Sequence, residues 1–154
     1  MGYRDTVEEF LENMTGRTFV KNANYDDSNK TLFINFFNSY EEYLNLNPET
    51  PHDKDTYLNY FGSGKQIEKL IVLEPARILR DFEYVEYVSI SLNFEGKQYD
   101  ANVSRKDLNN LIGFDIRELS PDDSSWKTKF SDVYGYGLKN PKRKELFEHF
   151  TIII

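Results

Sequence analysis

The chain contains no cysteine and only two histidines, and no apolar run approaches the length of a membrane span. The absence of cysteine excludes disulfides, thiolate catalysis, iron–sulfur clusters and cysteine-ligated zinc. A transmembrane helix needs about 18 or more apolar residues, so we expect no membrane span. The first ten residues lack the basic and apolar regions of a signal peptide. We therefore expect a soluble protein, cytoplasmic by default, although a leader removed before residue 1 stays open.

The 154 residues have 39% hydrophobic and 16% aromatic content, which is enough for one packed domain over residues 1–154. The formal net charge is -7 and the sequence pI is about 4.9. An acidic surface repels phosphate backbones and anionic lipids, so general nucleic-acid or membrane binding is disfavoured. A protein partner, in particular a basic one, fits this charge.

The stretch Val88–Val103 predicts a β-hairpin. Apolar and polar residues alternate on both sides of Glu95–Gly96, which is typical of two half-buried strands. A two-residue loop pairs Leu92 with Tyr99, and a slip by one residue would set Leu92 opposite Asp100. The outer face of this hairpin is polar and is expected to face water or a partner. Its residues are Ser89, Ser91, Asn93, Gln98, Asp100 and Asn102.

A second hairpin is predicted from Arg17–Tyr25 and Thr31–Phe37, joined by the polar turn Asp26–Lys30. Thr31–Phe37 carries apolar residues on both faces, which is typical of a central or covered strand. The final residues, Thr151–Ile154, predict a terminal strand or a core plug. The expected fold class is therefore α+β, with an antiparallel sheet of two hairpins plus a possible C-terminal strand and with helices packed on one face as two layers.

Helices are expected where capping signals precede apolar residues at helical spacing. Thr6 opens one that ends near Gly16, and Ser39 opens another at 40–44. The longest pattern is 65–82, interrupted by Pro75, which favours a kinked helix over a strand followed by a helix. Two further starts combine a cap with a following proline, at Ser120 and at Asn140.

Motifs for chemistry are weak. The sequence GSGK at 62–65 lacks the first glycine and the hydroxyl residue of a phosphate-binding loop, which favours a helix end followed by a helix start. His52 and His149 lack metal-ligand spacing. Adjacent acids stand at helix starts and turns, where they complement helix dipoles. Residues 1–6 match a loose myristoylation pattern, but Thr6 and Glu9 fit a capping box better. No catalytic residue, metal or cofactor is predicted.

Four residues are candidates for partner binding. Arg105 and Lys106 follow the cap Ser104, where free N–H groups and two cations could hold an anion or an acidic partner; alternatively, their stems cover apolar surface. Tyr134 and Tyr136 lie in a Tyr-Gly repeat, and tyrosine is frequent at interfaces.

The leading hypothesis is thus a non-catalytic protein-binding module. The alternatives are an acidic nucleic-acid mimic that occupies a basic cleft, and a hydrolase built from dispersed residues.

Overall fold

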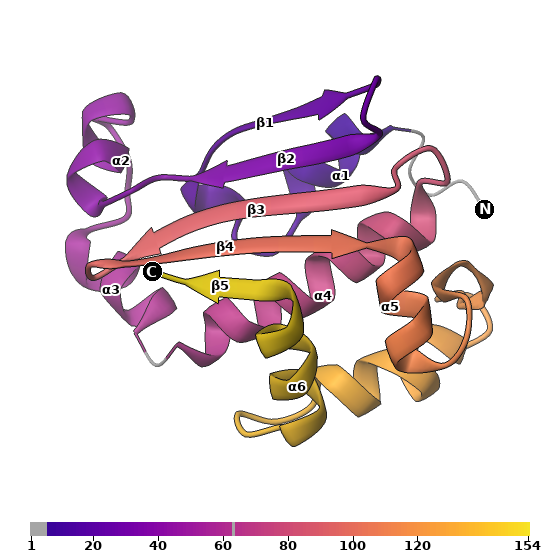
Figure 1. Cartoon of the computed structure of the whole chain (residues 1–154). Helices are drawn as coiled ribbons and strands as arrows, with labels where there is room; N and C mark the ends of the chain where they lie inside the picture. Colours follow the sequence, from indigo (N-terminus) through magenta and orange to yellow (C-terminus); the bar gives the residue numbers. More distant parts are fainter. Residues whose placement is uncertain (1–5, 63) are drawn as a thin grey trace.

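A computed structural model describes residues 6–62 and 64–154. The myristoylation pattern at 1–6 falls largely outside these residues. Figure 1 shows a five-stranded sheet with helices around it. The strands are β1 (Val20–Asp26), β2 (Thr31–Phe36), β3 (Tyr87–Phe94), β4 (Lys97–Ser104) and β5 (Thr151–Ile153). The α-helices are α1 (Val7–Asn13), α2 (Tyr40–Leu46), α3 (Lys54–Phe61), α4 (Lys65–Asp81), α5 (Arg105–Ile112) and α6 (Pro141–Phe150). Short 3₁₀ turns occupy η1 (Arg17–Phe19) and η2 (Ile116–Glu118), and η3 (Lys127–Gly135) is a π-helix.

The sheet is mixed, so the prediction of a purely antiparallel sheet is wrong. The strand order is β1-β2-β3-β4-β5, and β2 pairs with β3 in parallel whereas the other three pairs are antiparallel. The reason is the long connection through α2, α3 and α4. It returns the chain to the end of the sheet at which β2 began, so β3 runs in the same direction as β2. Parallel neighbours require such a crossover. The two predicted hairpins therefore lie side by side, joined through β2 and β3.

The predicted register of the second hairpin is confirmed. Leu92 pairs with Tyr99, and the pairing continues in register to Tyr87 and Ser104. The loop has two residues, with φ of 48° at Glu95 and 82° at Gly96. Positive φ at both central residues is the mark of a type I′ turn, whose twist matches that of paired strands.

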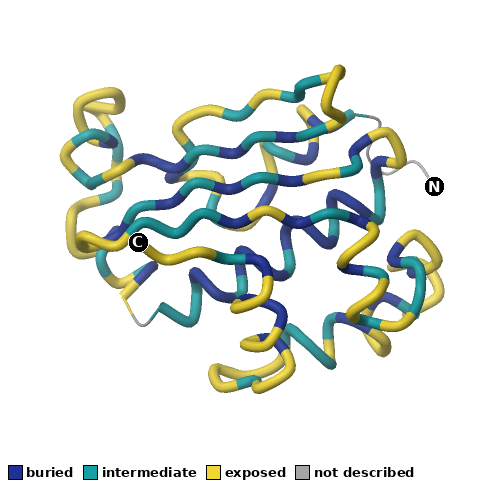
Figure 2. Tube along the Cα trace, in the orientation of Figure 1, coloured by how far each residue is buried: buried dark blue, intermediate teal, exposed yellow. Residues whose placement is uncertain are grey.

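The core lies on the side of the sheet that faces α4. Along β2 and β3, alternate residues are buried, and Figure 2 shows this alternation in the central strands. The predicted helix at 65–82 is confirmed as α4, with Pro75 inside it. In Figure 1, β3 and β4 pass in front of α4, while α2 lies beyond the end of β2. Packing of all helices in a single second layer stays a prediction.

The helix predicted from Ser120 begins later than expected. Ser120 Oγ accepts from the Asp122 N–H at 3.0 Å and so closes a turn, and Ser124 has a φ of 67°, which no helix accommodates. The chain then winds into η3, where the rings of Trp126 and Phe130 stack with centroids 4.7 Å apart. The terminal residues form β5 at the edge of the sheet, and their exposure excludes the core-plug alternative.

Candidate functional site

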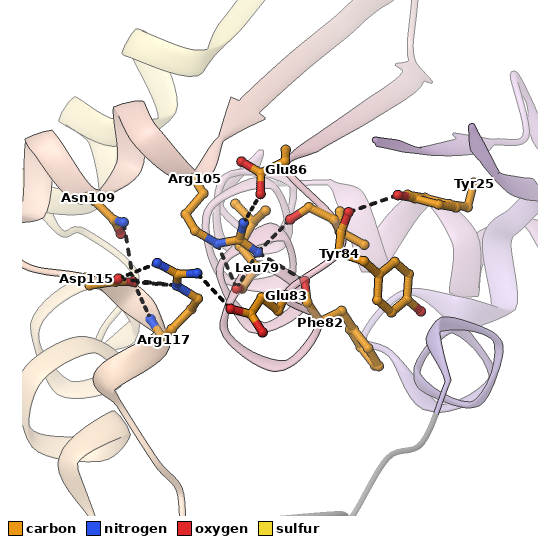
Figure 3. Close-up of polar contacts among 11 residues, drawn as sticks. Tyr25, Leu79, Phe82, Glu83, Tyr84, Glu86, Arg105, Asn109, Asp115 and Arg117 are labelled. Carbon is orange, nitrogen blue, oxygen red and sulfur yellow. Dashed lines mark hydrogen bonds and ion pairs between the residues drawn. The ribbon is translucent and has the colours of Figure 1, made fainter. Parts of the chain in front are cut away.

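Arg105, a predicted partner-binding residue, is buried, with only 4% of its surface exposed. Its guanidinium donates to the main-chain carbonyls of Leu79, Phe82 and Val85, at 3.0, 3.0 and 2.5 Å from Nη2. Nη1 donates to the Glu86 carboxylate at 2.8 Å (Figure 3). Burial lowers the pKa of Arg105, and the charge of Glu86 acts against that shift. These hydrogen bonds link the start of α5 to the end of α4 and to the loop before β3. The guanidinium of Arg105 therefore binds groups of its own chain.

A second arginine, Arg117, lies at the surface near Arg105 and pairs with two acidic side chains. Arg117 Nη2 lies 2.8 Å from an Asp115 carboxylate oxygen, and its Nη1 lies 3.3 Å from Glu83 (Figure 3). Hydrogen bonds from Arg117 lower the pKa of Asp115 to about 2. Asn109 contacts the start of η2 twice, because its Nδ2 donates to Asp115 Oδ1 at 3.4 Å and its Oδ1 accepts from the Ile116 N–H at 2.8 Å. The cluster thus fixes η2 against α5 and the α4–β3 loop.

The other three predicted residues lie apart from Arg105. Lys106 is exposed at the start of α5. Tyr134 lines a cleft of about 490 Å³ with residues of α5 and α6, and burial, followed by the charge of Glu145, raises its pKa. Tyr136 lies on the following loop with 78% of its surface exposed. Across the described part of the chain, no hydrogen bond, ion pair or ring contact joins these four side chains to one another.

The basic cluster at 139–144 is divided between surface and core. Lys139, Lys142 and Lys144 are exposed, but Arg143 is fully buried. Arg143 Nε donates to Glu68 of α4 at 2.9 Å, and its Nη atoms donate to carbonyls of the η3–α6 loop, including Leu138 O at 2.8 Å. Arg143 therefore fastens α6 and its preceding loop to α4.

The two histidines do not form an acid–base pair. The ring of His52 lies edge-on to Phe19, and His149 packs edge-on to Phe150. His149 shares its cleft with Glu145 and Glu148, yet within residues 6–62 and 64–154 neither imidazole is hydrogen-bonded to a carboxylate. In triad-type hydrolases, the histidine that acts as general base is oriented by a third group. This arrangement gives the hydrolase hypothesis no support.

The feature that distinguishes this molecule is the sheet face turned away from α4, which we call the open face. The register aligns the outward residues of the five strands in rows across the sheet. Its members are mostly amides and hydroxyls, with three larger apolar or aromatic residues. They are Asn22, Asn24, Asp26, Thr31, Phe33, Asn35, Tyr87, Ser89, Ser91, Asn93, Gln98, Asp100, Asn102, Ser104 and Ile152.

Charge is nearly absent from the open face. Asp26 and Asp100 are its only charged residues, although 29% of all residues are charged. Asp26 stands at a corner and accepts from the N–H and the hydroxyl of Ser28 in the β1–β2 turn, which lowers its pKa. Asp100 lies inside the face, where Gln98 Nε2 donates to both carboxylate oxygens at 3.0 Å.

Hydrogen bonds between asparagine side chains fix the positions of some residues at the open face. Asn35 Nδ2 donates to Asn22 Oδ1 at 2.8 Å across β2 and β1. At the end of β3, Asn93 Nδ2 donates to Asn38 Oδ1 at 2.6 Å. Phe33 lies between Asn24 and Ser89 in the register and is half-buried rather than covered by another element. The open face therefore presents the aromatic ring of Phe33 among side chains that can form hydrogen bonds.

The sequence patterns identified fewer than half of the residues of this face. The alternation in 88–103 identified six of its residues, which the structure shows as intermediate or exposed. The β1 and β2 residues were missed because a parallel pairing of β2 with β3 was not predicted. The available signal was the second alternating pattern in Thr31–Phe36, where Phe33 suggested a covered face.

Comparison of the chain with family models, with curated proteins and with solved structures found no match. Fold and face together define the class: an α+β protein with a mixed five-stranded sheet and a polar face that carries few charges. No helix among the described residues has both the length and the apolar character to cross a membrane. Nor do those residues include a group of three or more His, Cys, Asp or Glu side chains placed to hold a metal ion.

Proposed function

We propose that this chain is a non-catalytic protein-binding module and that the open face is its docking surface. The observation that carries the proposal is the scarcity of charge on the open face, which has only Asp26 and Asp100, in a chain of which 29% of the residues are charged. Charged residues are depleted at the centres of protein interfaces, because desolvating a charge costs more than desolvating an amide or a hydroxyl. A sheet face that only contacts water does not have to be desolvated, so lysine and glutamate would be favourable there.

The shape of the face favours a protein over a small ligand. Small molecules bind in concave sites, whereas a sheet presents a broad and gently twisted surface. Five strands about 4.8 Å apart and about six residues long span roughly 20 Å in each direction. This is a footprint of about 400 Å² before side-chain relief is added, about half of the ~800 Å² that one partner contributes to a standard interface. Phe33, Tyr87 and Ile152 supply apolar contact, and the amides supply donors and acceptors.

The chemistry of the partner follows from charge. The net charge of -7 steers a basic protein towards the chain, and Asp100 inside the face pairs with a lysine or arginine of that partner. The nucleic-acid-mimic alternative requires a free array of carboxylates. Many acids are instead engaged in ion pairs with the chain's own lysines and arginines, at Glu41, Glu42, Glu68, Glu74, Asp81, Glu83, Glu86, Asp115 and Asp132.

A photo-crosslinking experiment tests the location of the docking surface. Benzoylphenylalanine replaces Tyr87 on the open face in one variant and Tyr136 on the η3–α6 loop in the other; both tyrosines are exposed. We expect the Tyr87 probe, and not the Tyr136 probe, to capture a basic protein. Capture by the Tyr136 probe alone, or of the same protein equally from both positions, would contradict the proposal.

A matched pair of variants tests the role of the uncharged surface. Ser89→Arg adds a cation to the middle of the open face, whereas Asn110→Arg adds the same cation to the exposed side of α5. For the captured protein, Ser89→Arg weakens binding at least about tenfold, since the cation must be desolvated without a partner. Asn110→Arg leaves binding unchanged, and circular dichroism checks that both variants fold. Equal binding by the two variants would refute the assignment.

A further inference from the structure

The two edges of the sheet differ in how they are protected. β1 has a bulge between Val20 and Asn22, carries Lys21, and lies beside residues of α1 that line a common cleft with it. Bulges, lysines and covering helices are the means by which proteins prevent edge strands from pairing with other chains. The opposite edge, β5, has no charge, proline or bulge. It is therefore the edge open to pairing.

The hydrogen bonds of β5 show which of its main-chain groups point outward. The Gln98 N–H donates to Ile154 O at 3.2 Å, and the Ile154 N–H donates to Gln98 O at 3.0 Å. In an antiparallel pair, residues alternate between groups directed at the neighbouring strand and groups directed away from it. Since Ile154 is directed towards β4, the N–H and C=O of Ile153 are directed towards the open edge.

The side chains at this edge are apolar and exposed. Ile152, Ile153 and Ile154 expose 65%, 50% and 73% of their surface. Ile152 belongs to the open face, and Ile153 lies on the other side of the sheet, in register with Tyr99. Three consecutive exposed isoleucines next to a free main-chain edge are a pairing surface on both faces of the strand.

We propose that β5 pairs with β5 of a second copy of this chain, antiparallel and about a twofold axis at Ile153. The two Ile153 residues exchange N–H to C=O hydrogen bonds, and Ile152 of each copy lies opposite Ile154 of the other. A second copy is the occupant that fits, because each pair formed by residues 152–154 is then isoleucine with isoleucine, and these side chains carry no charge. The axis is perpendicular to the sheet, so the two open faces lie on the same side of one continuous sheet. This inference does not depend on the proposed function.

Sedimentation velocity over a range of concentrations tests the pairing. We expect the wild type to form a concentration-dependent dimer that strengthens with salt, because each copy has a net charge of -7 and salt screens their repulsion. Ile153→Asp sets two carboxylates opposite each other and weakens the dimer at least tenfold. Leu138→Asp, at an exposed leucine of the η3–α6 loop, is the matched control and leaves the dimer unchanged. A wild type that stays monomeric, or equal dimers in the two variants, would overturn the proposal.

The absence of cysteine allows a direct test of the register. Paired residues of this kind have Cα atoms about 5.5 Å apart, within the range of about 4.4–6.8 Å that a disulfide spans. Ile153→Cys therefore forms a disulfide-linked dimer under mild oxidation, and Leu138→Cys forms it much more slowly. Equal rates for the two variants would exclude an axis at Ile153. Because crosslinking at Tyr87 is measured separately, loss of the dimer and loss of partner binding are distinguishable.

Discussion

Replacement of Arg105 by methionine removes the donors that hold three segments of the chain together. Methionine keeps much of the apolar stem but leaves the carbonyls of Leu79, Phe82 and Val85 without the guanidinium. A buried polar group without a partner costs about 1–3 kcal/mol, and water reaches part of this site beside the exposed Glu86. We therefore expect a loss of about 3–5 kcal/mol in the free energy of unfolding, which is the combined cost of the Leu79 and Val85 carbonyls that lose their donor.

Urea denaturation followed by circular dichroism measures this loss. With a slope of about 2 kcal/mol per molar urea, the midpoint falls by about 2 M. The control is Lys106→Met at the adjacent position, where the side chain is exposed and the expected change is within about 0.5 kcal/mol. The reasoning is refuted if Arg105→Met costs less than about 1 kcal/mol, or if the two variants lose the same stability.

Two further predictions concern charged groups. Arg143→Met removes the closer partner of the buried Glu68, which then keeps only its longer ion pair with Lys65 at 3.7 Å, and we expect the unfolding free energy to fall by about 3 kcal/mol. The double variant with Glu68→Met recovers part of the loss. A double-mutant cycle in urea measures this recovery, and additive losses would show that the pair is not coupled. The pKa of Asp115 is lowered to about 2 from an ordinary value of 3.8, so its pairing with Arg117 stabilises the fold above the ordinary value, and this contribution is lost as the pH falls towards 2. Asp115→Asn therefore reduces the dependence of stability on pH between about 4 and 2, and an unchanged acid-denaturation profile would contradict that assignment.

Local patterns determined much of the fold from sequence alone. The β3–β4 register followed from alternation because side chains in a strand point to opposite faces in turn, and only one register places apolar residues opposite each other. The caps at Thr6 and Ser39 were equally readable, since each side chain accepts from a main-chain N–H three residues on, in Glu9 and Glu42. Such interactions depend on residues that are near in sequence.

The tertiary structure decided what depends on distant residues. The parallel pairing of β2 and β3 joins strands that are separated by three helices. A local sequence pattern does not indicate which strands will pair across such a distance. The same holds for Arg105, whose position after a cap suggested a surface cation, while the carbonyls that it binds come from the end of α4 and the loop after it. The sequence by itself determined the β3–β4 hairpin and its inward face, the hairpin of β1 and β2 without their inward face, and the exclusion of cysteine chemistry. Only the packed sheet brought β1 and β2 beside β3, and so joined two polar patterns into one broad face with few charges.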